Sequence, residues 1–153
     1  GVTRDTLLMR MKEEDWDTVL DTNLKGAFNT VKAFMRPLMK AEDPRIINIA
    51  SVIGLIGNAG QTNYSASKAG LWGLTKYLAT YWGRCGVRVN AVTPGGVYSG
   101  QNETFVRNYS AKVPLGRMAS EQDMAHAMQY LCSEASRYVT GHNLVVDGGW
   151  TAW

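Results

Sequence analysis

Three residues of this chain have the types and the spacing needed for chemistry: Ser51, then Tyr64, and then Lys68 four residues later. A Tyr and a Lys at positions i and i+4 lie on the same face of a helix. An ammonium beside a phenol favours the phenolate, so we expect the pKa of Tyr64 to be below its usual value of about 10. Such a Tyr is a general acid and base suited to a carbonyl or alcohol oxygen.

The Ser51 hydroxyl can donate a second hydrogen bond to the same oxygen. Together the three residues indicate carbonyl–alcohol redox chemistry in which a cofactor carries the hydride. Each also has an ordinary structural interpretation, as a helix-surface Tyr, a solvated Lys or a Ser in a turn. Their spacing favours the catalytic interpretation.

Three short runs rich in β-branched residues predict the strands that position these groups, namely Arg45–Ala50, Val87–Val92 and Asn143–Val146. Each is nearly continuous in apolar character, as are strands buried on both faces of a parallel sheet. Helices are expected over residues 13–39, 63–84 and 121–131, the last with Ser120 as its N-cap. This alternation predicts an α/β fold in which Ser51 follows a strand, where ligands gather in such sheets.

The first predicted helix carries an apolar stripe that includes one amide. Burying an amide without partners costs about 1–3 kcal/mol, so Asn23 should have specific hydrogen-bond partners. An Asn that only packs the helix against a neighbouring backbone is the alternative. The expected stripe consists of Trp16, Leu20, Asn23, Ala27, Val31 and Phe34.

Residues 95–114 form a different kind of segment. They are polar, begin with two glycines after Pro94 and contain at most one short helix, around residues 103–111. A segment of this length outside the sheet is commonly a lid over a binding site.

Composition excludes several classes of function. The chain has 153 residues, one domain's worth of material, and its net charge of +3 comes from scattered residues that predict no nucleic-acid or membrane partner. No apolar stretch approaches the roughly 20 residues of a membrane span. Cys85 and Cys132 lack metal-ligand spacing and indicate reduced thiols in a cytoplasmic protein. We also expect no metal at His126 or His142, which stand alone.

These motifs resemble the short-chain dehydrogenase/reductase family over essentially all of the chain. Ser51, Tyr64 and Lys68 have the family's spacing, and Asn23 in DTNLKGAF matches the Asn that completes its catalytic tetrad. The C-terminal VVDGGWTAW resembles the family's last strand and tail. The resemblance implies that Tyr64 exchanges the proton, that Ser51 binds the substrate oxygen with it, and that Asn23 holds a water in a proton relay to Lys68.

The resemblance also implies a nicotinamide cofactor, NADP or NAD with NADP favoured. Lys68 would hydrogen-bond the nicotinamide ribose beside Tyr64. The segment PGGVYS resembles the family's carboxamide-contacting segment, with a Ser where Thr is more usual. Its implied cofactor-binding residues are Pro94, Gly95, Val97 and Ser99.

The subfamily resemblance is divided. Residues 1–76 resemble 3-oxoacyl-acyl-carrier-protein reductases of fatty-acid biosynthesis, whereas residues 85–153 resemble sugar or sugar-acid oxidoreductases. The function expected is reduction of a 3-oxoacyl thioester or β-keto compound, small or carrier-bound, by a cytoplasmic homotetramer. A sugar or polyol dehydrogenase is the alternative, and a non-catalytic binding or assembly relative is another.

The family's Gly-rich phosphate loop and Asn-Asn-Ala-Gly segment are not found in the sequence. By resemblance, Gly1 corresponds to the Gly that closes the second of these. We therefore expect residues 1–153 to be one partial dinucleotide-binding and catalytic domain, the C-terminal part of a doubly wound, Rossmann-type parallel sheet. This chain by itself is expected to be inactive, with an unpaired apolar edge at the strand 45–50.

Overall fold

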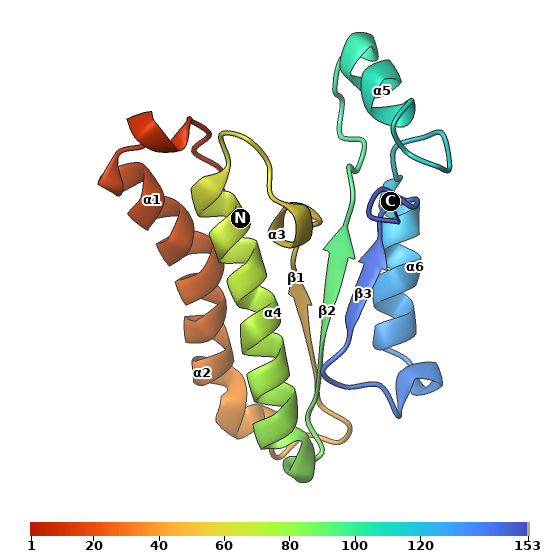
Figure 1. Ribbon diagram of the computed structural model, residues 1–153. Coiled ribbons are helices and arrows are strands. Elements are labelled where there is room, and N and C mark those ends of the chain that lie inside the picture. The colour runs from red at the N-terminus through yellow and green to blue at the C-terminus, as the bar shows by residue number, and fades with distance from the viewer. Residues whose placement is uncertain (153) are drawn as a thin grey trace.

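A three-stranded parallel sheet with helices on both faces forms the centre of the molecule (Figure 1). The computed structural model describes residues 1–152. Helix–strand alternation and parallel pairing confirm the predicted α/β fold, consistent with the C-terminal part of a Rossmann-type domain. Its elements are α1 Glu13–Leu20, α2 Gly26–Leu38, β1 Arg45–Ile49, α3 Ile53–Ile56, α4 Thr62–Trp82, β2 Arg88–Pro94, α5 Glu103–Ser110, α6 Glu121–Leu131 and β3 Asn143–Val146.

The strands lie in the order β1-β2-β3, and both neighbouring pairs are parallel. Helices α1, α2 and α4 lie on one side of the sheet and α6 on the other (Figure 1). Parallel neighbours require crossover connections, which α4 supplies between β1 and β2 and α6 supplies between β2 and β3. All three carboxyl ends therefore point the same way, towards α3 and α5.

One predicted strand has the bounds that the structure shows, and the other two differ from it by one or two residues at their ends. Strand β3 has the predicted bounds, β1 ends one residue early, and β2 begins one residue late and continues to Pro94. Helix α6 begins after Ser120 as predicted, because the Ser120 hydroxyl accepts from Asp123 N–H at 3.2 Å while the Asp123 carboxylate accepts from Ser120 N–H at 2.7 Å. This reciprocal pair is a capping box.

The predicted helix 13–39 contains a π-helical turn over Asp21–Lys25, between α1 and α2. A π turn inserts one residue into the helix, which rotates everything downstream by about 100°. Beyond the turn the predicted stripe is wrong at Phe34, which is 59% exposed whereas its neighbour Met35 is buried; Val31 packs against the core as predicted. Val19 is buried upstream of the turn, and Asn23 is buried within it.

Strand β2 lies in the middle of the sheet and is buried from Arg88 to Thr93. Val87 and Val89 pack there against Met35 of α2 and Leu78 of α4. Burying each such side chain contributes about 1.5–3 kcal/mol, so this cluster fixes the helices against the sheet. This cluster lies at the beginning of β2, and Pro94 lies at the other end of the strand.

Strand β1 pairs with β2 alone among residues 1–152, which leaves its other edge without a ladder partner in the described chain. Ile49 at its end is 43% exposed. The edge carries the apolar character expected from the sequence, and such an edge is prone to pair with another strand.

Candidate active site

Ser51 lies where β1 ends, beside the end of β2. Ala50 N–H donates to Val92 O at 2.8 Å, and Val52 N–H donates to Pro94 O at 3.0 Å. These two bonds extend the parallel pairing past the strands, so Ser51 and Pro94 are held side by side. The first turn of α4, which carries Tyr64, faces the same end of the sheet (Figure 1).

The Ser51 hydroxyl lies near the Tyr64 phenol and acts to lower the pKa of Tyr64. Ser51 Oγ also accepts from Ile53 N–H at 3.2 Å, which orients the hydroxyl at the start of α3. Ser65 Oγ donates to Ile53 O at 2.9 Å and ties α3 to α4. The Ser51 hydroxyl and the Tyr64 phenol, which are thirteen residues apart in the sequence, therefore lie near each other.

Lys68 is buried one helical turn after Tyr64. Its Nζ donates to Ile49 O at 2.7 Å and lies 5.6 Å from the centre of the Tyr64 ring. Burial disfavours the charged ammonium and lowers the pKa of Lys68. The ammonium therefore points to the end of β1 and beneath the Tyr64 ring.

The expected fall in the Tyr64 pKa is wrong for this structure. Burial raises the pKa of Tyr64, and the opposing Ser51 hydrogen bond does not outweigh it. The Lys68 ammonium faces the ring and bonds a backbone carbonyl, so it gives the phenolate no direct partner. Without a ligand, Tyr64 is a neutral phenol at neutral pH.

This reversal predicts a measurable titration. The difference in absorbance near 295 nm between the wild type and Tyr64→Phe should show no phenolate below about pH 10, the usual Tyr pKa. Because the folded-state pKa is raised, the stabilising contribution of this group is present below pH 10 and is lost as pH rises further. A Tyr64 phenolate that forms near pH 8 in the ligand-free protein would contradict the structure.

Asn23 is buried in the π turn, and its amide is held by two segments. Its Oδ1 accepts from Val2 N–H at 2.7 Å, and its Nδ2 donates to Val2 O at 2.9 Å and to Ser67 Oγ at 3.2 Å. The amide therefore has the specific partners that its burial requires, and it pins the N-terminal segment to α4. Its expected role in a water relay stays a prediction.

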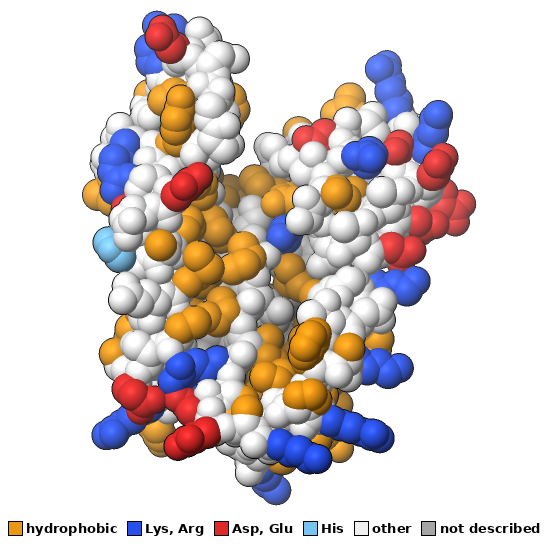
Figure 2. Space-filling model, turned by 180° about the vertical axis from the view of Figure 1, so that it is seen from behind, with side chains coloured by type: hydrophobic (Ala, Val, Ile, Leu, Met, Phe, Trp, Pro, Cys, Tyr) orange, Lys and Arg blue, Asp and Glu red, His pale blue; other side chains and the backbone are white. Residues whose placement is uncertain are grey.

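Asn23 and Lys68 line the same hollow, which has a volume of about 330 Å³ and lies between α2 and β1. Ile47 and Ile49 contribute to its wall. Figure 2 shows the molecule from behind, with hydrophobic side chains gathered in the hollow between its two halves. Of the four tetrad positions of the sequence analysis, Asn23 and Lys68 thus share this hollow, whereas Ser51 and Tyr64 are not part of its wall.

The segment Pro94–Ser99 leaves the sheet beside Ser51 and leads to the lid segment, residues 95–114. Gly95 N–H donates to Val146 O at 3.0 Å. Val97 pairs with Ala119 in an isolated parallel β-bridge. Ser99 lies further out, where its N–H donates to Gln101 Oε1 at 2.7 Å. Of the predicted cofactor contacts, Pro94 is therefore beside the Ser51 loop, and Ser99 belongs to an exposed turn.

Comparison with known proteins gives a match over nearly the whole chain. A family model described as enoyl-(acyl carrier protein) reductase matches residues 1–151. The chain belongs to the short-chain dehydrogenase/reductase family.

Among the relatives of this family member are 3-oxoacyl-acyl-carrier-protein reductases. Those of Chlamydia muridarum and Escherichia coli are each 44% identical to it, and that of Thermotoga maritima is 43% identical. Each alignment covers 97% of this chain, but only 62–63% of the relative. The chain thus spans less than two thirds of the length of these relatives.

Sequence reasoning missed Asn63, which is fully buried immediately before Tyr64. Its Nδ2 donates to Arg4 O and to Asp15 O, both at 3.1 Å, and its Oδ1 accepts from Tyr64 N–H at 2.8 Å. Asn63 thereby fixes the first turn of α4 and the backbone of Tyr64. The available signal was an Asx residue at a helix start, where such side chains bond local backbone.

Tyr109 in α5 was also missed. Its hydroxyl accepts from Gly96 N–H, so it contacts the segment predicted to bind the nicotinamide. Nothing in the local sequence relates two positions thirteen residues apart in a loop and a helix.

Other kinds of site find no support in the described residues. Within residues 1–152, no group of three or more His, Cys, Asp or Glu side chains is arranged to hold a metal ion. None of the helices in this part of the chain is long and apolar enough to cross a membrane.

Proposed function

We propose that the full-length family member is an NAD(P)-dependent oxidoreductase that interconverts a ketone and a secondary alcohol. We propose a 3-oxoacyl thioester or related β-keto compound, carrier-bound or small, as its substrate. The observation that supports this most is the meeting of Ser51, Tyr64 and Lys68 at the carboxyl end of a parallel sheet. The printed names of the relatives support the substrate class.

The residues at this end fit a nicotinamide nucleotide, with NADP favoured over NAD. Lys68 uses one of its three donors on Ile49 O, which leaves donors for ribose hydroxyls. Its lowered pKa shows that the buried ammonium lacks solvation that a polar ligand would restore. Pro94 lies beside the Ser51 loop, and Gly95 and Val97 follow it at the carboxyl end of β2, where open α/β sheets bind ligands.

The bound nicotinamide supplies the hydride for reduction or accepts it in oxidation. In reduction, Ser51 and Tyr64 hydrogen-bond the carbonyl oxygen and orient the carbonyl carbon. As the hydride bonds to that carbon, the Tyr64 phenol transfers its proton to the oxygen, and the product is a secondary alcohol. Lys68 stabilises the resulting phenolate, and Asn23 is proposed to support its reprotonation through a water.

Tyr64 in this structure is in the form that reduction needs. Burial raises its pKa, so the phenol is protonated at neutral pH, as an ordinary Tyr also is. Oxidation would begin from the phenolate, and burial disfavours that form.

Apolar side chains near the site support an acyl substrate. Leu55 and Ile56 in α3 follow Ser51 directly and are 39% and 53% exposed, and Phe105 of the lid segment is 48% exposed. An acyl chain would remove such surfaces from water at about 25 cal/mol per Å².

A sugar or polyol dehydrogenase is the second candidate. A hollow of about 510 Å³ beside α5 has a wall that is mostly apolar, with Val106 and Met118, but that also includes the polar side chains of Gln101, Glu103 and Arg107. Hydrogen-bonding groups of this kind suit a polyhydroxylated substrate.

Assembly into a homotetramer is part of the proposal. Helices α2 and α4 expose five large aromatic side chains, which suit an interface better than water. We further propose a cytoplasmic location, because both cysteines are free and exposed. The exposed aromatic residues are Phe28, Phe34, Trp72, Tyr77 and Tyr81.

The test uses the full-length protein with NADPH or NADH and two kinds of substrate. Acetoacetyl thioester should be reduced with at least a tenfold higher kcat/KM than a keto-sugar, a difference of about 1.4 kcal/mol in transition-state binding. The reverse preference would favour the sugar candidate. Failure to bind either cofactor, measured by nicotinamide fluorescence, would instead favour a non-catalytic relative.

A further inference from the structure

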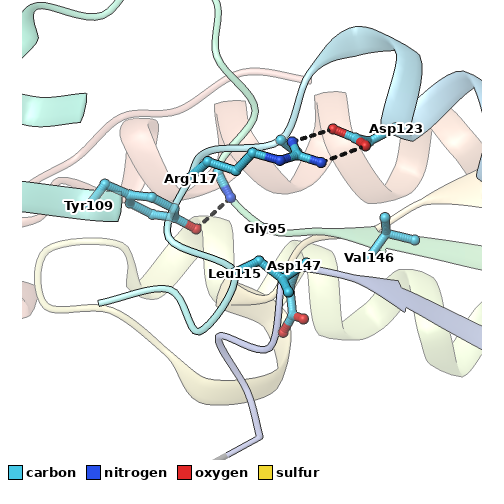
Figure 3. A pocket seen from close by; sticks show the side chains of 10 residues that line it. Gly95, Tyr109, Leu115, Arg117, Asp123, Val146 and Asp147 are labelled. Carbon is cyan, nitrogen blue, oxygen red and sulfur yellow. Dashed lines mark hydrogen bonds and ion pairs between the residues drawn. The ribbon is translucent and has the colours of Figure 1, made fainter. Parts of the chain in front are cut away.

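The Tyr109 side chain joins the lid segment to the end of the sheet. Tyr109 belongs to α5, and its hydroxyl accepts a hydrogen bond from Gly96 N–H at 2.5 Å, the contact drawn in Figure 3. Gly96 is only two residues beyond the end of β2. This bond therefore crosses from the lid helix to the first turn of the predicted nicotinamide-contacting segment.

Gly96 is a glycine for reasons of space. A Cβ added there would lie 2.5 Å from Tyr109 Cζ and 2.8 Å from its hydroxyl oxygen. The backbone of Gly96 does not have the positive φ that other glycines of the chain adopt. The absence of a side chain thus serves the close approach of the Tyr109 ring, not an unusual backbone conformation.

The ring of Tyr109 is itself held in place. Trp150 stacks on it with ring centres 4.5 Å apart and planes 9° apart, and Phe105 stacks at 6.0 Å. Trp150 lies within a turn in which the Asp147 carboxylate accepts from Gly149 N–H and Thr151 N–H. The C-terminal turn after β3 therefore sets where the Tyr109 hydroxyl lies.

The opposite side of the segment is fixed by Ala119. Ala119 N–H donates to Gly96 O at 2.9 Å, and Tyr98 N–H donates to Ala119 O at 2.8 Å. Val97 consequently lies between two anchored residues. Of these two hydrogen bonds and the one between Gly96 and Tyr109, only the last involves α5, the helix of the lid segment.

We propose that Tyr109 is a positioning residue for cofactor binding: by holding Gly96 it sets the backbone groups of Val97 to meet the nicotinamide carboxamide. This inference rests on the proposed function and adds to it a residue outside the tetrad. Binding must otherwise order this segment, and ordering costs affinity. A segment that is fixed before binding avoids that cost.

The experiment compares Tyr109→Phe with the wild type in the full-length protein. Phe keeps the ring stack and removes only the hydroxyl. We expect amide hydrogen exchange across residues 95–99 to be about tenfold faster, and the Kd and KM for NAD(P)H to rise about three- to tenfold, the range for one neutral hydrogen bond. The kcat should stay within about twofold. Tyr138→Phe, at a fully exposed Tyr, is the matched control.

A second variant tests the same contact from the other partner. Gly96→Ala should displace the Tyr109 ring and raise the KM for NAD(P)H to a similar degree. Combining Gly96→Ala with Tyr109→Ala should relieve the collision, so the double variant loses less than the sum of the single changes.

Unchanged exchange and cofactor affinity in Tyr109→Phe would overturn the inference. Faster exchange with unchanged affinity would overturn it as well, because the contact would then be structural only. A wild type that binds no NAD(P)H would overturn the proposed function, and the inference with it. Binding by the wild type with no change in the variant overturns the inference alone.

Discussion

Replacing Tyr64 by Phe in the full-length protein should reduce turnover by about 10²- to 10⁴-fold, the range for loss of a general acid. The ring remains, and with it the surface under which Lys68 lies. The phenol proton that is proposed to pass to the substrate oxygen is lost. Steady-state rates with NADPH and acetoacetyl thioester measure this effect.

Two accompanying measurements separate chemistry from folding. Cofactor affinity of Tyr64→Phe should stay within a few-fold of the wild type, because the change removes one hydroxyl and no charge. Tyr130→Phe in α6 serves as the control for loss of a phenol hydroxyl elsewhere. A Tyr64→Phe protein that turns over at nearly the wild-type rate would refute the proposed mechanism.

Replacing Lys68 by Met should weaken NAD(P)H binding about ten- to a hundredfold. Hydrogen bonds from a charged donor contribute about 1.5–3 kcal/mol, which corresponds to that range of affinity. Turnover should also fall, because the phenolate that forms at Tyr64 loses its nearby ammonium. Titration of the cofactor and steady-state kinetics check the two effects separately.

The same substitution should leave the free energy of unfolding unchanged or increased. Burial lowers the folded-state pKa of Lys68, so the fold disfavours its ammonium at every pH below the usual Lys value of about 10.4. Met has a similar length and no charge. Loss of function without loss of stability, measured in urea, is typical of a residue kept for binding or catalysis.

Lys76→Met provides the matched control on the same helix. The Lys76 ammonium lies 4.6 Å from the centre of the Trp72 ring, away from the candidate site. The Lys76→Met substitution should change neither cofactor affinity nor turnover. Equal effects of the Lys68 and Lys76 substitutions would contradict a specific role for Lys68.

Local patterns predicted most of the elements. The β-branched runs predicted three parallel strands, although only β2 is buried along most of its length, and Ser120 marked the start of α6, because these signals depend on neighbours within a few residues. The stripe of the first helix failed at Phe34, after the turn Asp21–Lys25, since no local signal revealed the inserted π residue. Met35 therefore occupies the place predicted for Phe34.

By itself, the sequence determined which residues would meet: spacing on one helix face joins Tyr64 to Lys68, and the end of a parallel strand brings Ser51 to them. The tertiary structure decided what that meeting does to them. Whether a phenol beside a lysine becomes more or less acidic depends on how deeply both are buried and where the ammonium points, and here burial raises the pKa of Tyr64. The same holds for Tyr109, whose contact with Gly96 exists only because a lid helix and a C-terminal turn fold against the end of β2.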